Sequence, residues 1–265
     1  MATVAELTAP YENFMVAPRR GPGICEVCFT FTSGYARCYA CAGTEQAIDV
    51  MAPISYSVAH EQLHHVLAAY KREPGTVGRR LTVQLAAVLW RHLALHERCV
   101  ARAAVQATAA VRATAAVGAV AATHEIDRFE LVTTVPSSDP SRDETHPLHA
   151  IVGELAGPTR GRHQRLLRRT DRPVAPHLAY PKKFEASRRL HGEPVLLIDD
   201  TWTTGANAQS AAAVLKAAGA GPVAALVIGR HLKREWHENG HRLGDISTPF
   251  DWRTCALCAD SNRLP

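Results

Sequence analysis

The chain has 265 residues, and its 30 lysines and arginines against 25 aspartates and glutamates give a formal net charge of +5. Hydrophobic residues make up 46% and charged residues 21%, which excludes a disordered, collagen-like or helical-repeat protein. The mild positive charge permits an anionic ligand but does not by itself indicate a nucleic-acid surface.

The sequence shows no targeting or membrane segment. Its most apolar stretch, residues 101–123, is interrupted by Arg102, Gln106 and Arg112, so a membrane-spanning helix is not expected. The N-terminal residues lack the basic start and apolar run of a signal peptide. We therefore expect a cytoplasmic protein with no membrane partner, in which seven cysteines favour metal binding over disulfides.

The patterns along the chain divide it into four parts. The first 20 residues show no periodicity and are expected to form a flexible N-terminus. A compact cysteine module follows over residues 21–45. A large domain is predicted over residues 46–231, followed by a polar, irregular C-terminal tail over residues 232–265.

The cysteine module contains two C-x-x-C pairs, Cys25 with Cys28 and Cys38 with Cys41. Four thiolates at this spacing match a tetrahedral zinc site in which each pair forms a knuckle. A four-cysteine site has no open coordination position, so we predict a zinc-ribbon-like module with structural Zn²⁺.

The first part of the large domain is predicted to be helical. Apolar residues recur at i, i+3, i+4 and i+7 within residues 57–70, which indicates a helix that stops before Pro74. The same reasoning predicts a second helix over residues 81–96 and a third over the Ala-rich residues 101–123.

The second half of the large domain alternates strands with helices. Its apolar runs predict strands over residues 129–135, 165–170, 194–198 and 222–228, with helices over residues 148–156 and 206–218. Residues 171–192 are rich in proline and charge and predict a mobile loop. This order indicates an α/β fold with a parallel sheet and helices on both faces.

The strongest chemical signal follows the apolar run that ends at Ile198. Asp199 and Asp200 stand at the end of this buried strand, the edge of a parallel sheet where ligands bind. A threonine-rich turn then closes at Gly205 and leads into a helix, so its N–H groups and the helix dipole form an anion cradle. Carboxylates beside a phosphate cradle suit a sugar phosphate. The chain lacks the glycine motifs of P-loop and dinucleotide-binding proteins.

This segment resembles the signature of type I phosphoribosyltransferases, in which four apolar residues precede two acids and T-T-G. The resemblance implies that Asp199 and Asp200 are the catalytic pair that holds the ribose of phosphoribosyl pyrophosphate (PRPP), with Mg²⁺ as cofactor. It further implies substrate binding by the following turn and by two residues facing the pyrophosphate: Thr201, Thr203, Thr204, Gly205, Ala206, Asn207, Ser137 and Arg169. Lys182 and Lys183 fall where the family has a flexible lid.

The phosphoribosyltransferase signature together with the cysteine module is similar to the ComF-like (competence protein F) family. This resemblance implies transfer of a phosphoribosyl group from PRPP to a nitrogen acceptor. The family's Arg-Gly-Phe-Asn-Gln segment is absent, and residues 143–147 read DETHP instead. A second interpretation therefore stays open, namely a non-catalytic protein that binds PRPP or a nucleotide in DNA uptake or regulation. The sequence also leaves a homodimer open.

Other patterns carry weaker signals. His60 and His64 complete an H-E-x-x-H zinc-protease motif, but among 14 histidines a chance match is expected and a third ligand is not evident. The basic residues 160–172 could contact nucleic acid, yet aromatic residues for base stacking are missing. Cys255 and Cys258 form a third C-x-x-C pair, which could contribute to a second metal site or merely pack. Cys99 is predicted to be a small buried apolar residue.

Overall fold

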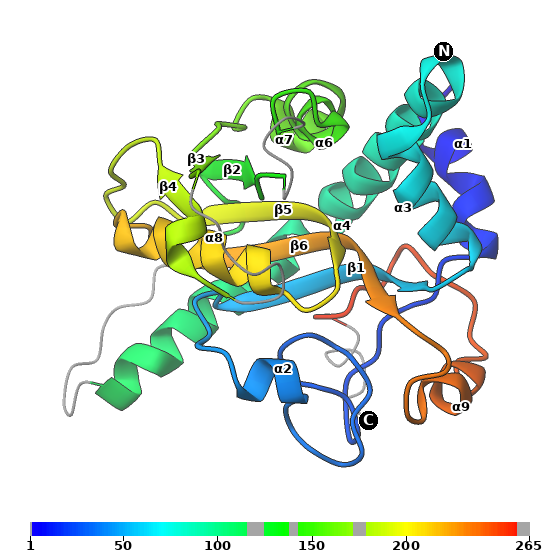
Figure 1. Cartoon of the computed structure of the whole chain (residues 1–265), viewed down its shortest axis with the longest axis horizontal. Helices are drawn as coiled ribbons and strands as arrows, with labels where there is room; N and C mark the ends of the chain where they lie inside the picture. Colours follow the sequence, from blue (N-terminus) through cyan, green and yellow to red (C-terminus); the bar gives the residue numbers. More distant parts are fainter. Residues whose placement is uncertain (1, 116–124, 138–142, 172–178, 259–265) are drawn as a thin grey trace.

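The computed structural model describes residues 2–115, 125–137, 143–171 and 179–258 (Figure 1). At its centre lies a parallel sheet in the order β1-β6-β5-β2. The strands are β1 (Val50–Val58), β6 (Val223–Leu232), β5 (Val195–Trp202) and β2 (Leu131–Thr134). The predicted α/β class with a parallel sheet is confirmed.

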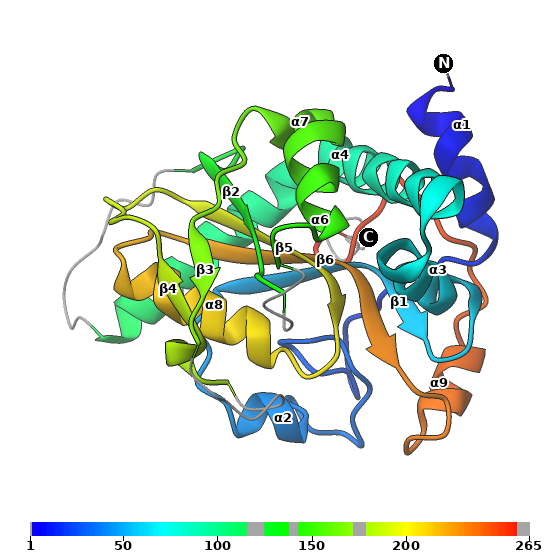
Figure 2. The same cartoon turned by 45° about the horizontal axis from the view of Figure 1, so that its top comes forward.

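Helices cover both faces of the sheet (Figure 2). One face carries α3 (Gln62–Arg72), α4 (Gly75–Ala115), α6 (Pro147–Ala150), the π-helical turn η2 (Ile151–Leu155) and α7 (Gly157–Arg160). The other face carries α8 (Ala206–Ala217) and the cysteine module, which contains α2 (Tyr39–Ala42). The sheet is thus the middle layer of three.

The two faces of the sheet divide the core into two clusters, as the period-two geometry of a strand requires. In β5, Leu196 and Ile198 pack under α4, whereas Val195 and Leu197 pack against α8. All four side chains are fully buried. This arrangement accounts for the unbroken apolar run of β5, because neither face of the strand meets water.

Several elements differ from the predicted ones. Residues 57 and 58, predicted to be helical, end β1, a strand that the sequence analysis does not predict, and α3 begins only at Gln62. The two helices predicted over residues 81–96 and 101–123 are one helix, α4, as far as the described residues extend to Ala115. Because α4 contains no proline and no glycine after Gly78, nothing in the chain interrupts it.

The segment predicted as a mobile loop contains regular structure where it is described. The short 3-10 helix η3 (Pro181–Lys183) leads into β4 (Phe184–Ala186). This strand pairs antiparallel with β3 (Leu167–Arg169), so the predicted strand over residues 165–170 belongs to a separate two-stranded sheet. The remaining part of the predicted loop, residues 172–178, lies outside the described residues.

Both ends of the described chain are ordered against the core. Residues 1–20 are predicted to be flexible, but from Ala2 onward they include α1 (Val4–Thr8) and η1 (Ala9–Asn13). A capping box stabilises the N-terminus of α1. Tyr11 is buried in the cluster under the sheet. The C-terminal segment contains α9 (Asn239–Gly244) and buries Trp252 in the same cluster. Within the described ranges, every helix is too short or too polar to cross a lipid bilayer.

Candidate functional site

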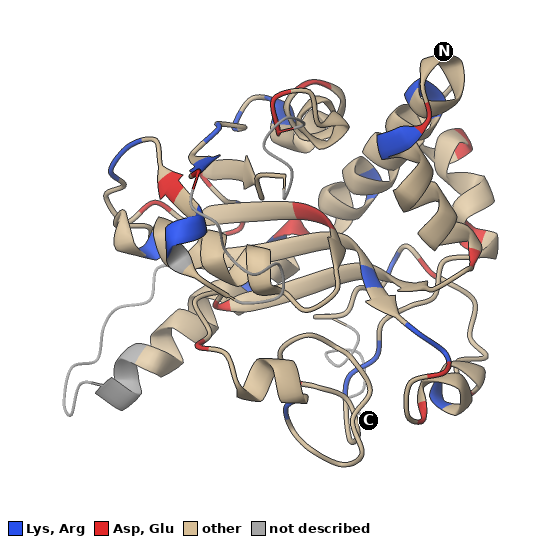
Figure 3. Cartoon of the chain, in the orientation of Figure 1, with Lys and Arg blue, Asp and Glu red and all other residues tan. Residues whose placement is uncertain are grey.

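A cavity of about 440 Å³ opens at the carboxyl edge of the parallel sheet, between the ends of β2 and β5 and helix α3. In an open parallel sheet this edge is the usual place for a ligand. The acidic residues of β5 lie at its carboxyl-terminal end (Figure 3). The cavity brings together these residues predicted from the sequence: Ser137, Asp199, Asp200, Thr201, Thr203 and Asn207.

The turn between β5 and α8 has the backbone geometry of an anion cradle. Gly205 adopts a left-handed conformation with φ of 81° and forms the N-cap of α8. A Cβ atom at this position would lie 2.1 Å from the Trp202 ring, so the turn requires glycine. Thr203 and Thr204 are exposed beside it, and the Thr204 hydroxyl accepts a hydrogen bond from the Ala206 N–H at 3.3 Å.

Asp200 is buried and already paired within the chain. Its carboxylate accepts hydrogen bonds from the Tyr70 hydroxyl and from Lys71 Nζ, at 2.9 Å to Oδ1, and Lys71 Nζ lies 2.7 Å from Oδ2. Burial, and next the Asp200 charge, raise the pKa of Tyr70 above its ordinary value, so the phenol stays protonated as a donor. Asp200 therefore serves to anchor α3 at the site.

Asp199 is the more accessible acid of the pair. Its side chain is half-buried and lines the cavity. Burial, followed by the charge of Asp200, raises the pKa of Asp199 to about 8. Hydroxyl donors or a cation next to this carboxylate would favour its ionised form. The Asp199 carboxylate can thus accept hydrogen bonds from ribose hydroxyls, bind a Mg²⁺ ion, or do both.

Two cationic side chains lie close to the loops that surround the cavity. Lys183 is buried and donates to Asn207 Oδ1 at 3.3 Å, and Arg169 donates to the Ser137 carbonyl oxygen, also at 3.3 Å. Burial, and next the charge of Arg169, lower the pKa of Lys183. Lys182, the other predicted lid cation, is exposed. The cations connect the β3–β4 sheet to both loops of the site.

The loop after β2 carries an acid that the sequence analysis does not assign. Asp143 Oδ1 accepts a hydrogen bond from the Ser137 N–H at 2.6 Å, and Asp143 Oδ2 pairs with Arg165 at 3.0 Å. A carboxylate of the chain itself therefore satisfies a backbone donor that would otherwise face an anion. Residues 143–147, which depart from the ComF-like pattern, supply this acid.

The basic residues 160–172 are largely used in ion pairs. Besides Arg165, Arg162 contacts Glu97 on α4 at 2.5 and 2.9 Å, and Arg168 contacts Glu185 on β4 at 2.6 Å. The pair with Glu97 is mostly buried, whereas the pair with Glu185 is exposed. Three of the arginines in this basic run are therefore neutralised by acidic side chains of the chain itself.

The H-E-x-x-H residues do not share a helical face. His60 precedes α3 with φ of 65°, and Glu61 pairs with Arg234 on the protein surface. Among the described residues, the groups with metal-ligand geometry are two tetrads that do not include His60 or His64. His64 instead lines the cavity with His231, their ring centroids 5.2 Å apart.

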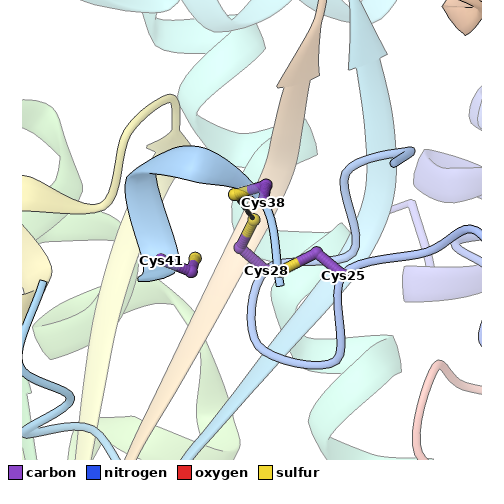
Figure 4. A group of neighbouring side chains, drawn as sticks. All are labelled: Cys25, Cys28, Cys38 and Cys41. Carbon is purple, nitrogen blue, oxygen red and sulfur yellow. Dashed lines mark hydrogen bonds between the residues drawn. The ribbon is translucent and has the colours of Figure 1, made fainter. Parts of the chain in front are cut away.

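The N-terminal tetrad is a buried cluster consistent with a zinc ribbon. The ligand atoms of Cys25, Cys28, Cys38 and Cys41 all lie within 4.8 Å of one another, and the sulfurs of Cys28 and Cys38 are 3.7 Å apart (Figure 4). This is the separation that two thiolates have on a tetrahedral zinc with Zn–S bonds of about 2.3 Å.

A buried cation lies against one sulfur of this tetrad. The Arg230 guanidinium donates to Cys28 Sγ at 3.4 Å and to the Cys28 carbonyl oxygen at 2.6 Å. Hydrogen bonds among the four thiols lower the pKa of Cys25, and the hydrogen bonds with Cys25 raise the pKa of Cys38 and of Cys41. The residues therefore fit the predicted structural zinc, and the contact of Arg230 on β6 would fasten the module to the sheet.

The second tetrad consists of His96, Cys99, Cys255 and Cys258, whose ligand atoms also lie within 4.8 Å of one another. Cys99 is therefore not a simple apolar core residue. The sequence analysis leaves a second metal site open for Cys255 and Cys258 but misses His96. Its signal was present, because His96 and Cys99 are three residues apart and so share one face of a helix.

Comparison with known proteins gives no match. A scan against protein-family models finds none for this chain, and searches of the curated proteins and of the solved structures find none either.

Proposed function

We propose that the chain is a ComF-like phosphoribosyltransferase that binds PRPP and transfers its phosphoribosyl group to a nitrogen acceptor. The observation that carries this proposal is the convergence of Asp199, Thr203 of the T-T-G turn and Ser137 around one cavity. Carboxylates, an anion cradle and nearby cations are the groups that a pentose with phosphates at both ends requires.

In this proposal each part of PRPP has its own partner. The 5′-phosphate binds the N–H groups of the turn at Gly205 and the exposed hydroxyls of Thr203 and Thr204. The ribose hydroxyls donate hydrogen bonds to Asp199. The pKa of this carboxyl is raised by burial, and such hydrogen bonds would stabilise its ionised form. Lys183 and Arg169, which contact Asn207 and the Ser137 carbonyl beside the cavity, would stabilise the negative charge of the leaving pyrophosphate.

The reaction follows from these placements. The C1–O bond of PRPP breaks and its electron pair leaves with pyrophosphate, while the nitrogen lone pair of the acceptor forms the new bond to C1 and the nitrogen then loses a proton. Asp199, which lines the cavity, would help to hold a Mg²⁺ ion bound with PRPP, and this ion would supply positive charge to the leaving pyrophosphate. The chain's own contribution is to position the substrate and to stabilise its charges.

A second candidate is a non-catalytic PRPP- or nucleotide-binding protein. The hydrogen bond from the Ser137 N–H to Asp143 favours it, because that donor is then not available to a pyrophosphate oxygen. The pairing of Asp200 with Lys71 favours it as well, since Asp200 is committed to the fold. Both candidates share ribose-phosphate binding and differ in bond breaking.

Calorimetric titration of the full chain with PRPP and with ribose 5-phosphate, each with and without Mg²⁺, tests the shared part. We expect saturable binding that Asp199→Asn weakens by about tenfold or more, because a charged hydrogen-bond acceptor contributes about 1.5–3 kcal/mol. Asp245→Asn, an exposed acid after α9, is the matched control and should bind like the wild type. Equal affinities for all three chains would refute the site.

Pyrophosphate release separates the two candidates. The wild-type chain, Mg²⁺ and PRPP are incubated with ammonia and with a panel of nitrogen bases, and pyrophosphate is measured enzymatically. Release that depends on an acceptor supports transfer. PRPP binding without release for any acceptor assigns the second function.

A further inference from the structure

We propose that His96, Cys99, Cys255 and Cys258 form a second structural zinc site, which fastens the C-terminal segment to α4. The proposal is independent of the function of the cavity. Its basis is that three thiols and one imidazole nitrogen from two distant parts of the chain lie within 4.8 Å of one another. A Cys₃His set is a usual ligand set for structural zinc.

The distances fit a tetrahedral ion. With a Zn–S bond of about 2.3 Å and a Zn–N bond of about 2.0–2.1 Å, a thiolate sulfur and an imidazole nitrogen lie about 3.6 Å apart. The sulfur of Cys258 and Nδ1 of His96 are 3.7 Å apart. This pair of ligand atoms therefore already stands at the separation that coordination imposes, and the other ligand atoms lie within 4.8 Å.

The imidazole of His96 is oriented for coordination through Nδ1. Its other nitrogen, Nε2, lies 2.7 Å from the Trp252 carbonyl oxygen, which can only accept a hydrogen bond. Nε2 must therefore carry the proton, and Nδ1 presents its lone pair toward Cys258. A ring N–H fixed by a backbone carbonyl is the usual second contact of a metal-bound histidine.

The local backbone supports both halves of the site. His96 and Cys99 are three residues apart on α4 and so lie on one face of the helix. At the other half, the Leu257 N–H donates to Cys255 Sγ at 3.4 Å, and the Cys255 N–H donates to Cys258 Sγ at 3.2 Å. Backbone donors aimed at both sulfurs stabilise the negative charge of thiolates.

Cysteine usage agrees with this assignment. The chain has seven cysteines, and the two tetrads together contain all of them. All seven are free thiols rather than disulfide-bonded. The segment that the second site would fasten also carries Trp252, which is buried beneath the Arg91 guanidinium, 4.7 Å from the ring. Metal, tryptophan and arginine would together hold this segment against α4.

Zinc content is the direct test. The full chain is purified under reducing conditions, and bound zinc is measured by plasma mass spectrometry in the wild type, in Cys258→Ser and in Cys28→Ser. We expect two zinc ions per chain in the wild type and one in each variant. Only one ion in the wild type, with that ion kept by Cys258→Ser, would overturn the proposal.

Cobalt spectra test the same site with a variant that keeps four ligands and so keeps the metal. In chains refolded with Co²⁺, His96→Cys should keep two ions, and its spectrum should move from a mixed Cys₃His and Cys₄ signal toward a pure Cys₄ signal. His65→Ala, an exposed histidine on α3, is the control and should leave the spectrum unchanged. A His96→Cys spectrum identical to that of the wild type would exclude His96 as a ligand.

Thiol counting addresses the alternative of a C-terminal disulfide. Denatured with chelator but without reductant, the chain should titrate as seven thiols and release its zinc. Five thiols, with Cys255 and Cys258 joined in the same peptide, would show a disulfide and overturn the metal site.

Discussion

Lys71→Met should destabilise the protein far more than Asp200→Asn, although both substitutions break the same ion pair. The two side chains differ in solvent access, with 29% of Lys71 exposed against 4% of Asp200. Without Lys71, a buried carboxylate keeps the Tyr70 hydroxyl but loses its counterion. Removal of one partner from a buried pair costs about 3–5 kcal/mol, and because Lys71 is partly exposed we expect about 3 kcal/mol.

The reverse substitution leaves an ammonium group that water can reach. Asp200→Asn should therefore cost about 1–2 kcal/mol, the scale of a lost charge-assisted hydrogen bond. It also removes a negative charge next to Asp199, which offsets part of the loss. The double variant contains neither charge and should lose about 1–2 kcal/mol, so the two single losses should exceed it by about 2–3 kcal/mol.

Urea denaturation at pH 7, followed by circular dichroism, measures these free energies of unfolding. The exposed pair of Arg37 and Glu26 is the control, because both side chains are about half exposed and Arg37→Met should cost under about 1 kcal/mol. Equal losses for Lys71→Met and Asp200→Asn, or single losses that sum to that of the double variant, would refute the role given to burial.

Two further predictions concern the same edge of the sheet. Gly205→Ala should lower the free energy of unfolding by about 2–4 kcal/mol, from left-handed strain and overpacking against Trp202, whereas Gly161→Ala, which meets open space, should be nearly neutral in urea denaturation. Asp199 keeps its proton up to about pH 8 in the folded chain but releases it near pH 4 when unfolded, so stability should fall as pH rises between these values. Asp199→Asn should flatten this fall when the free energy of unfolding is measured in urea at pH 5, 6, 7 and 8. An unchanged dependence of that free energy on pH would contradict the raised pKa of Asp199.

The elements around the turn between β5 and α8 could be predicted from the sequence because their local signals agree. β5 and β6 are unbroken apolar runs, and α8 begins directly after the glycine that closes the turn. β1 has no such signal, because Pro53, Ser55 and Ser57 interrupt its pattern. Those residues are tolerated because β1 is an edge strand, where proline need not donate to the ladder.

The site could be predicted only where its residues are close in sequence. Asp199 and the turn up to Asn207 form one continuous motif, so their place at the sheet edge followed from the strand that precedes them. Lys71 gives no comparable signal, because it reaches Asp200 across 129 positions of the chain. Asp143 is similar, since no sequence pattern links its carboxylate to the Ser137 N–H that it contacts. Such pairings belong to tertiary structure.

The strand order has a consequence for how this protein folds during its synthesis. β1 emerges early, yet its sheet neighbour is β6, whose first residue comes 173 positions after that of β1. Until β6 leaves the exit tunnel, the nascent chain exposes the apolar side chains of β1 and β5 along unpaired edges. The sheet therefore cannot be completed before β6 has been made, and a chain that lacks β6 presents the apolar edges that a holdase chaperone would bind.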